Sequence, residues 1–162
     1  MKKINLFVYG SLREGFFNYD KYLAGKEVEK KDAILENMRL YHMPYKGYPA
    51  ITPGNDKVLG EIMVINEEEY DETVKDMDEM EGFISENNPE NEYHKIVLEV
   101  KNLQTNEKEK CFVYFYNKDK DKVFKDIISC SSSLTRSHSH TFFSYFNTLV
   151  TYCYSIISIY YS

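Results

Sequence analysis

A single well-defined helix set among β-prone runs is the feature that most limits how this chain can fold. Tyr70, Val74 and Met77 form an apolar stripe at helical spacing, and Gly82 follows as a C-terminal glycine. Asn66 has a glutamate three residues on, which resembles a capping box, and the acidic residues between them suit the positive end of the helix dipole. We therefore expect one main helix between Asn66 and Gly82.

Five apolar runs around this helix indicate strands. They cover residues 5–9, 33–43, 58–65, 92–100 and 110–117. About ten polar residues connect the last two runs, which favours an antiparallel pair. We expect a short helix at 20–23 and turn-rich backbone at 45–56, where Pro and Gly gather. The pattern as a whole predicts a mostly antiparallel sheet or barrel.

Length and charge narrow the class of protein. The chain has 162 residues, enough for one domain with its own core and too few for two comfortable ones. Its formal net charge is −6, and a nucleic-acid binder needs a basic face. We therefore exclude nucleic acid as a partner and expect a small molecule or a protein.

Cysteine usage and the first residues indicate a cytoplasmic protein. Cys111, Cys130 and Cys153 form no C-x-x-C pair, and an odd number cannot close a disulfide framework. The apolar run after the two N-terminal lysines is too short for a signal peptide, because Arg13 interrupts it. A reducing cytoplasm is the expected compartment.

The end of the chain has a different composition. No Asp, Glu or Lys follows Asp126, and the segment from Thr141 onward carries no charged side chain. That segment has the length of a membrane span, roughly 20 residues, but Ser, Thr, Asn and Tyr interrupt it throughout, so we disfavour a span. We predict a domain over residues 1–126 and an atypical tail over 127–162. The tail is either disordered or loosely packed, or an aberrant sequence such as an out-of-frame ending would produce.

The first strand stops abruptly at Gly10 and Ser11. A glycine there permits a tight turn and leaves the backbone amides uncovered, so they can bind an anion or a carbonyl oxygen. A plain turn is the alternative. A Walker-type phosphate loop is excluded, because Phe16 and Phe17 stand where that pattern needs Lys and then Ser or Thr.

Glu81 is the main candidate for acid–base chemistry. It takes the next position on the apolar stripe of the helix, so its carboxylate points at the core. The helix dipole opposes a negative charge in the last turn, and Asp78 adds a like charge. These effects raise the pKa from about 4.3 toward about 6 to 7, where general acids and bases work well. The alternative is a carboxylate that turns outward to solvent at a frayed helix end.

The histidines give no metal site. His42 and His94 are isolated in the sequence, which is typical of surface or hydrogen-bonded histidines. His138 and His140 have no third ligand nearby. We expect neither a metal nor another cofactor.

Two further features concern the last predicted strand. Cys111 has no base beside it in the sequence and is interpreted as a buried thiol. Tyr114 and Tyr116 share one face of this strand, because side chains alternate along a strand. They are candidates for lining a cavity, and Tyr116 is the one we assign to substrate binding.

Several stretches, taken in order, resemble the gamma-glutamylcyclotransferase-like family, the AIG2-like and YtfP-like group. They are VYGSLREG with FNYDKYL, then GYPAI, VLGEIMVI, MDEMEGF and EYHKIVLEV, within a match from about Lys3 to Asn117. The resemblance implies an α+β fold: a small mixed, mostly antiparallel β-barrel with flanking helices. It also implies a cavity between the loop Tyr9, Gly10, Ser11 and Leu12 and an essential glutamate, which here is Glu81.

The chain departs from the family pattern at two places. Lys95 stands where the family often has arginine, two residues after Tyr93. After the last strand, residues 127–129 lead to Cys130 and the uncharged tail, whereas members commonly continue with a Gly-Asp-Trp-like segment. The second departure supports an aberrant C-terminus.

The resemblance implies cyclisation of a gamma-glutamyl amide to 5-oxoproline with release of the free amine. The substrate's own α-amine attacks its γ-carbonyl, so the protein needs neither a nucleophile nor a metal. Glu81 would carry the proton, and the loop amides would hold the substrate's carboxylate or the developing oxyanion. The alternative is a module that binds a small metabolite in the same cavity without turnover. The choice among gamma-glutamyl substrates and the oligomeric state stay open.

Overall fold

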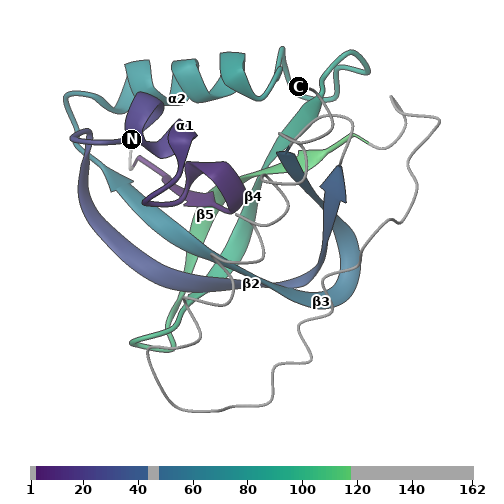
Figure 1. Ribbon diagram of the computed structural model, residues 1–162, viewed down its shortest axis with the longest axis horizontal. Coiled ribbons are helices and arrows are strands. Elements are labelled where there is room, and N and C mark those ends of the chain that lie inside the picture. Colours follow the sequence, from purple (N-terminus) through teal and green to yellow (C-terminus); the bar gives the residue numbers. More distant parts are fainter. Residues whose placement is uncertain (1–2, 44–47, 118–162) are drawn as a thin grey trace, which may run out of the picture.

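Five strands form the framework of the molecule, whose computed structural model describes residues 3–43 and 48–117 (Figure 1). The elements are β1 (Asn5–Val8), the 3-10 turn η1 (Gly10–Leu12), α1 (Phe17–Tyr22), β2 (Glu27–Met43), β3 (Tyr48–Ile65), α2 (Tyr70–Met80), β4 (Tyr93–Asn102) and β5 (Lys108–Tyr116). The strands form a closed barrel in the order β1-β3-β2-β4-β5. This confirms the predicted small mixed barrel with flanking helices.

The barrel closes through its shortest strand. β1 pairs antiparallel with β3, with Leu6 opposite Met63. On its other edge β1 pairs parallel with β5, with Leu6 opposite Phe112. All other strand pairs are antiparallel, and β4 and β5 are neighbours as predicted. The sheet is therefore mixed only at the point of closure.

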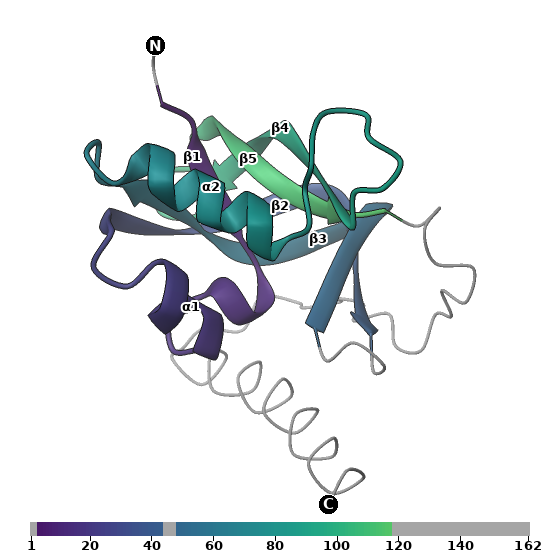
Figure 2. The same cartoon turned by 90° about the horizontal axis from the view of Figure 1, so that it is seen from above.

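Side chains on the two faces of the strands form two apolar clusters. Phe7, Ile62 and Val113 belong to the cluster inside the barrel. Leu6 and Met63, on the opposite face, pack with Met77 of α2. The helices α1 and α2 lie on the outside of the strands (Figures 1 and 2). Because side chains alternate along each strand, one strand supplies both clusters.

The predicted start of the main helix is wrong, while its end is confirmed. The N–H of Asn66 lies 2.8 Å from the carbonyl oxygen of Lys26, the residue before β2, and its side-chain oxygen accepts the N–H of Glu68 at 3.1 Å. Asn66 thus caps a turn that precedes the helix, which starts later, at Tyr70. At the other end Gly82 has φ +61°. The N–H of Gly82 donates to Glu79 and that of Phe83 to Asp78, which is the Schellman arrangement.

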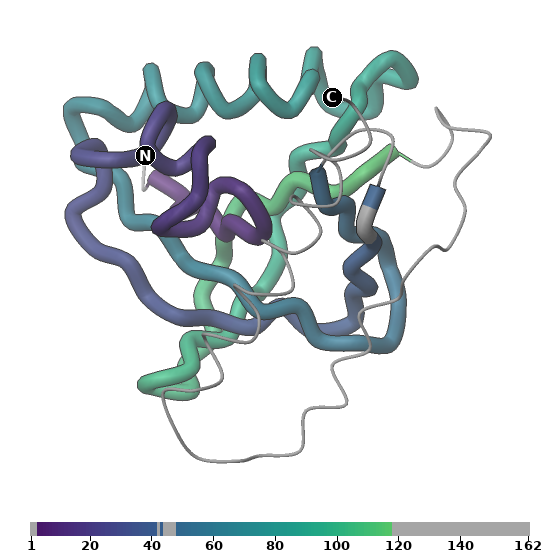
Figure 3. Tube along the Cα trace, in the orientation of Figure 1, coloured from purple at the N-terminus to yellow at the C-terminus, as the bar shows by residue number. Residues whose placement is uncertain are grey.

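The prediction of turn-rich backbone over residues 45–56 is wrong for residues 48–56, and residues 45–47 lie outside the described part of the chain. β3 begins at Tyr48 and pairs with β2 along its length, so the two form a long bent ribbon (Figure 3). Met38 pairs with both Pro53 and Asp56, which makes the Pro-Gly stretch a bulge rather than a reversal. Strand pairing on both sides of the bulge overrides the local turn preference. The same pairing starts β2 at Glu27 rather than at Ala33.

Smaller boundary differences occur at the ends of other elements. α1 covers Phe17–Tyr22, three residues earlier at its start than predicted. β4 and β5 are joined by a short turn over residues 103–107, because both strands extend further into the polar segment than expected. The antiparallel register, with Tyr93 opposite Tyr116, therefore runs almost the full length of both strands.

Several predictions concern residues outside the described part of the chain. These are the domain boundary after Asp126, the tail over 127–162, the pair His138 and His140, and the side chain of His42. Within the described ranges, no helix is long and apolar enough to cross a membrane.

Phe7 tests the interior of the barrel. Its side chain is 2% exposed, so Phe7→Ala should lower the free energy of unfolding by about 3–5 kcal/mol through lost burial and a cavity. Val97→Ala on β4, where the side chain is 42% exposed, should change it by less than about 0.5 kcal/mol. Urea unfolding followed by circular dichroism measures both. Equal losses would show that the interior cluster is not the main source of stability.

Candidate active site

A buried ion pair fixes the loop that follows β1. Nε of Arg13 lies 3.2 Å from Oε1 of Glu61 on β3, and these side chains are 7% and 10% exposed. The other oxygen of Glu61 accepts the backbone N–H of Glu14 at 3.0 Å. Removing one partner of such a buried pair costs about 3–5 kcal/mol, because the remaining charge is left without compensation. β3 therefore determines where η1 lies.

Gly10 is required by backbone geometry at the start of η1. Its φ is +72°, and a Cβ on it would lie 2.3 Å from Cγ of Pro49. A methyl group at this position would collide with Pro49, so Gly10→Ala perturbs the fold before it can report on a ligand. The N–H of Arg13 bonds to the carbonyl of Gly10, a bond that does not involve the amides of Ser11 and Leu12.

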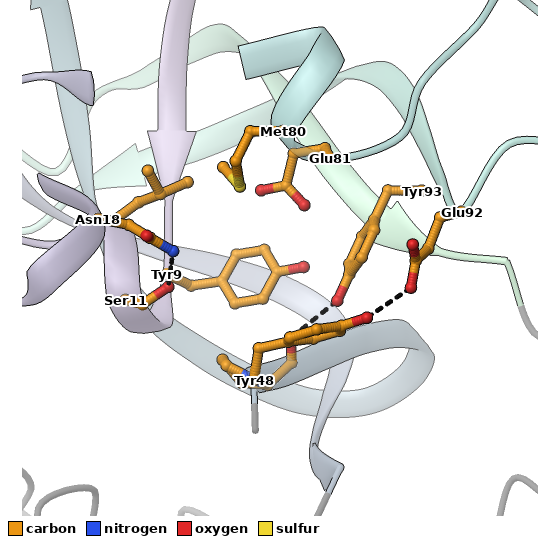
Figure 4. Close-up of a pocket in the computed structure, with 10 residues that line it drawn as sticks. Tyr9, Ser11, Asn18, Tyr48, Met80, Glu81, Glu92 and Tyr93 are labelled. Carbon is orange, nitrogen blue, oxygen red and sulfur yellow. Dashed lines mark hydrogen bonds between the residues drawn. The ribbon is translucent and has the colours of Figure 1, made fainter. Parts of the chain in front are cut away.

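A cavity of about 200 Å³ lies between η1, α1 and the ends of β3, α2 and β4 (Figure 4). Its walls are Tyr9, Ser11, Leu12, Asn18, Tyr48, Pro49, Met80, Glu81, Glu92 and Tyr93. Sites for drug-sized ligands are larger, roughly 300–1,000 Å³. The cavity is thus suited to a ligand of about amino-acid size.

Glu81 points its carboxylate into this cavity (Figure 4). It is the C-terminal cap residue of α2, so the Schellman arrangement after it sets its direction. None of the described residues donates a hydrogen bond to the carboxylate. Burial raises the pKa of Glu81 to about 8, and the nearby charge of Glu92 adds to the increase. At pH 7 most of the Glu81 side chains therefore carry a proton.

The like charge that raises the pKa of Glu81 is not the one predicted. Oδ2 of Asp78 lies 2.6 Å from Nζ of Lys95, and its other oxygen accepts a hydrogen bond from Tyr114 at 2.6 Å. Asp78 is thus occupied, and Glu92 acts on Glu81 instead. Sequence spacing could not show this, because Glu92 lies just before the next strand rather than in the helix.

Tyrosine hydroxyl groups hold the walls of the cavity in place. Tyr9 donates to the carbonyl of Tyr114 at 2.7 Å, and Tyr93 donates to the carbonyl of Pro49 at 3.1 Å. Burial raises the pKa of Tyr9 and of Tyr93, so both stay neutral at ordinary pH. Tyr116 packs edge-on against the ring of Tyr93, with 5.4 Å between centroids. It supports the wall from behind and does not line the cavity.

The structure brings most of the predicted site residues together. Tyr9, Ser11, Leu12 and Glu81 line one cavity, while Gly10 and Tyr116 lie behind it. The residues that sequence reasoning missed are Asn18, Tyr48, Pro49, Met80, Glu92 and Tyr93. Four of these lie in the stretches GYPAI and EYHKIVLEV of the family pattern, which was the signal that could have found them.

Other candidate groups have structural surroundings. Cys111 is fully buried in the barrel, and burial raises its pKa to about 12. His94 is half-buried and packs against Phe115, with 5.1 Å between ring centroids. In the part of the chain that the structure describes, no cluster of three or more His, Cys, Asp or Glu could hold a metal ion.

The fold and the cavity define a class: a small mixed β-barrel with a cavity between a glycine-containing loop and a glutamate. The family model for gamma-glutamyl cyclotransferase, AIG2-like, matches residues 6–132. The chain therefore belongs to this family. No curated protein matches the chain.

Three solved structures share the fold. The Arabidopsis thaliana protein At3g28950.1 has 18% identity and a TM-score of 0.60, covering 98% of this chain and 82% of its own. A mouse AIG2-like protein has 19% identity and a TM-score of 0.56, covering 87% and 93%. At5g39720.1, also from A. thaliana, has 16% identity and a TM-score of 0.53, covering 98% and 93%. At these identities the likeness concerns the fold.

The raised pKa of Glu81 makes a prediction about stability. The folded protein binds this proton more tightly than the unfolded chain, whose glutamate has a pKa of about 4.3. The stability that this tighter proton binding contributes is therefore fully present below about pH 4.3 and is lost as pH rises through about 8. Glu81→Gln has no charge to bury. Its free energy of unfolding should therefore rise relative to that of the wild type by on the order of 3–4 kcal/mol as pH increases from 5 to 9.

Urea unfolding at several pH values measures this difference. Glu79→Gln is the matched control, because Glu79 is exposed on the same helix and should show no such pH-dependent gain. A constant difference between Glu81→Gln and the wild type over this pH range would contradict a raised pKa for Glu81.

Proposed function

We propose that this chain is an enzyme that cyclises a gamma-glutamyl amide to 5-oxoproline and releases the free amine. The observation that carries the proposal is the position of the Glu81 carboxyl group, which faces a cavity of about amino-acid size. The pKa of this group is raised to about 8. Family membership supports the reaction class. In this reaction the α-nitrogen of the substrate bonds to the carbon of its own γ-carbonyl group, and the bond from that carbonyl carbon to the leaving amine breaks.

Glu81 would move the proton that this exchange requires. The α-ammonium group of the substrate must lose a proton before its nitrogen can attack, and the leaving amine must gain one. A reference α-ammonium group has a pKa of about 8, so Glu81 and the substrate hold the proton with similar affinity. Proton transfer in both directions is then close to balanced, which suits one group acting first as base and then as acid.

The loop at η1 would bind the negative part of the substrate. The described residues that line the cavity include no Lys or Arg, so the amides of Ser11 and Leu12, two of these lining residues, would serve as donors for a carboxylate or oxyanion. Asn18 donates to Oγ of Ser11 at 2.9 Å, which leaves the hydroxyl proton of Ser11 available for a ligand. Tyr9 and Leu12 would contact the glutamyl group, and Gly10 and Tyr116 would support these walls.

Ring closure within one molecule explains why so little other machinery is needed. An amine and a carbonyl held in one folded chain react with effective molarities of roughly 10⁵–10⁸ M. Enclosure of the glutamyl group in a cavity of about 200 Å³ would restrict it to folded conformations. The protein then contributes shape and proton transfer rather than a nucleophile of its own.

The proposal predicts 5-oxoproline release from at least one compound in a panel of gamma-glutamyl amides and peptides. Glu81→Gln should keep the fold and lower turnover by at least about 10²-fold, because an amide cannot exchange the proton. Glu79→Gln should retain wild-type turnover. Chromatography of 5-oxoproline measures all three proteins. Binding without product for every compound would favour the metabolite-binding alternative, and full turnover by Glu81→Gln would exclude Glu81 from the chemistry.

A second prediction concerns the pH dependence of kcat/KM. Glu81 and the substrate ammonium group can hold two protons between them. One of these must be lost before the amine can attack, and the other must remain to protonate the leaving amine. The profile should therefore be bell-shaped with its maximum at about pH 8, rising on the acid side and falling on the alkaline side. Initial rates between pH 5.5 and 10 measure it. A rate that keeps rising to pH 10 would show that no retained proton is needed.

A further inference from the structure

A second carboxylate lines the cavity near the first. Glu92 precedes β4, and Figure 4 shows its carboxylate and that of Glu81 on either side of the Tyr93 ring. The N–H of Glu92 donates to the carbonyl of Gly82 at 3.0 Å, and that of Tyr93 donates to the carbonyl of Glu81 at 3.2 Å. These two bonds hold the backbones of both glutamates together, so the charges cannot move far apart.

Neighbouring groups also fix the side chain of Glu92. The hydroxyl group of Tyr48 donates a hydrogen bond to Oε1 of Glu92. The ring of Tyr48 in turn packs against that of Tyr93, with 6.2 Å between centroids. A Cβ on Gly82 would lie 3.0 Å from Cβ of Glu92, so the chain has little room to shift there. A hydrogen bond donated to a carboxylate favours its charged form.

The other described groups named as neighbours of Glu81 carry no net charge toward it. Tyr9 from the end of β1, Tyr93 from β4 and Tyr114 from β5 are neutral, because burial raises the pKa of each hydroxyl. Asp78, on α2 itself, is paired with Lys95. Among the described residues that line the cavity, Glu92 is thus the charge that acts on Glu81.

We propose that Glu92 is a positioning residue for proton transfer: its fixed negative charge keeps Glu81 a strong enough base to deprotonate the substrate's ammonium group. This inference rests on the proposed function. A weaker base would be ionised in the free protein but would accept the ammonium proton less readily. Glu92 touches no reacting atom in this account and acts only through Glu81.

Carbon-13 NMR of protein labelled at the glutamate δ-carbon tests the inference without a substrate. The titration of Glu81, assigned by comparison with Glu81→Gln, is followed in four proteins. Glu92→Gln should lower the pKa of Glu81 by about half a unit or more, because a like charge is removed. Glu92→Asp keeps the charge and should stay close to the wild type. Glu86→Gln removes an exposed charge from the same connection between α2 and β4 and should change nothing.

The pH profile of kcat/KM provides the catalytic readout. In Glu92→Gln the acid limb should move to lower pH by the shift seen in the NMR titration, and turnover at the optimum should fall. Glu92→Asp should restore both. A thermal melt of each variant establishes that it is folded, and Glu92→Ala, which removes the same charge, carries the test if the glutamine variant is not folded.

The outcomes separate the two proposals. An unchanged pKa of Glu81 in Glu92→Gln, or a change no larger than in Glu86→Gln, overturns the role of Glu92 and leaves the proposed function intact. A lowered pKa together with wild-type protein that makes no 5-oxoproline from any gamma-glutamyl compound overturns the proposed function, and with it the role of Glu92 in proton transfer.

Discussion

The structure depends on β1 being buried on both faces and bonded on both edges. Leu6, Phe7 and Val8 are each no more than 4% exposed, although they point in alternate directions. Phe7 fills the barrel, and its two neighbours pack under the helices. Pairing with β3 on one edge and β5 on the other closes the barrel. A strand of four residues thus contributes to both apolar clusters, and the first residues of the candidate site follow directly after this strand.

Because β1 is fixed in this way, the loop that follows it has few alternatives. The ion pair of Arg13 with Glu61 ties the far side of η1 to β3, and the same strand presents Pro49 against Gly10. On the opposite side of the cavity, the Schellman arrangement and two backbone bonds hold Glu81 beside Glu92. Backbone contacts therefore keep a carboxyl group where its charge is disfavoured. Proteins commonly accept such a loss of stability at a functional site.

The parts predicted from sequence are those that local patterns determine. The apolar stripe and Gly82 place Glu81 at the end of a helix facing inward, and Gly10 marks the end of the first strand. The errors arise where long-range contacts override local preference: the N–H of Asn66 is bonded to Lys26, and the Pro-Gly stretch of β3 becomes a bulge. Glu92 and Tyr48 were missed for the same reason, because only the closed barrel brings them to Glu81.

The two ends of the cavity also differ in their polar and charged groups. Residues of η1 lie at one end, and two carboxylates lie at the end formed by α2 and β4, with no Lys or Arg among the described lining residues. Under the proposed function, an amino-acid head group fits this field in one orientation, with its carboxylate toward η1 and its ammonium group toward Glu81. Ring closure then requires the γ-carbonyl to fold back beside the amine. The polarity of the cavity would thus select the conformation from which the ring closes.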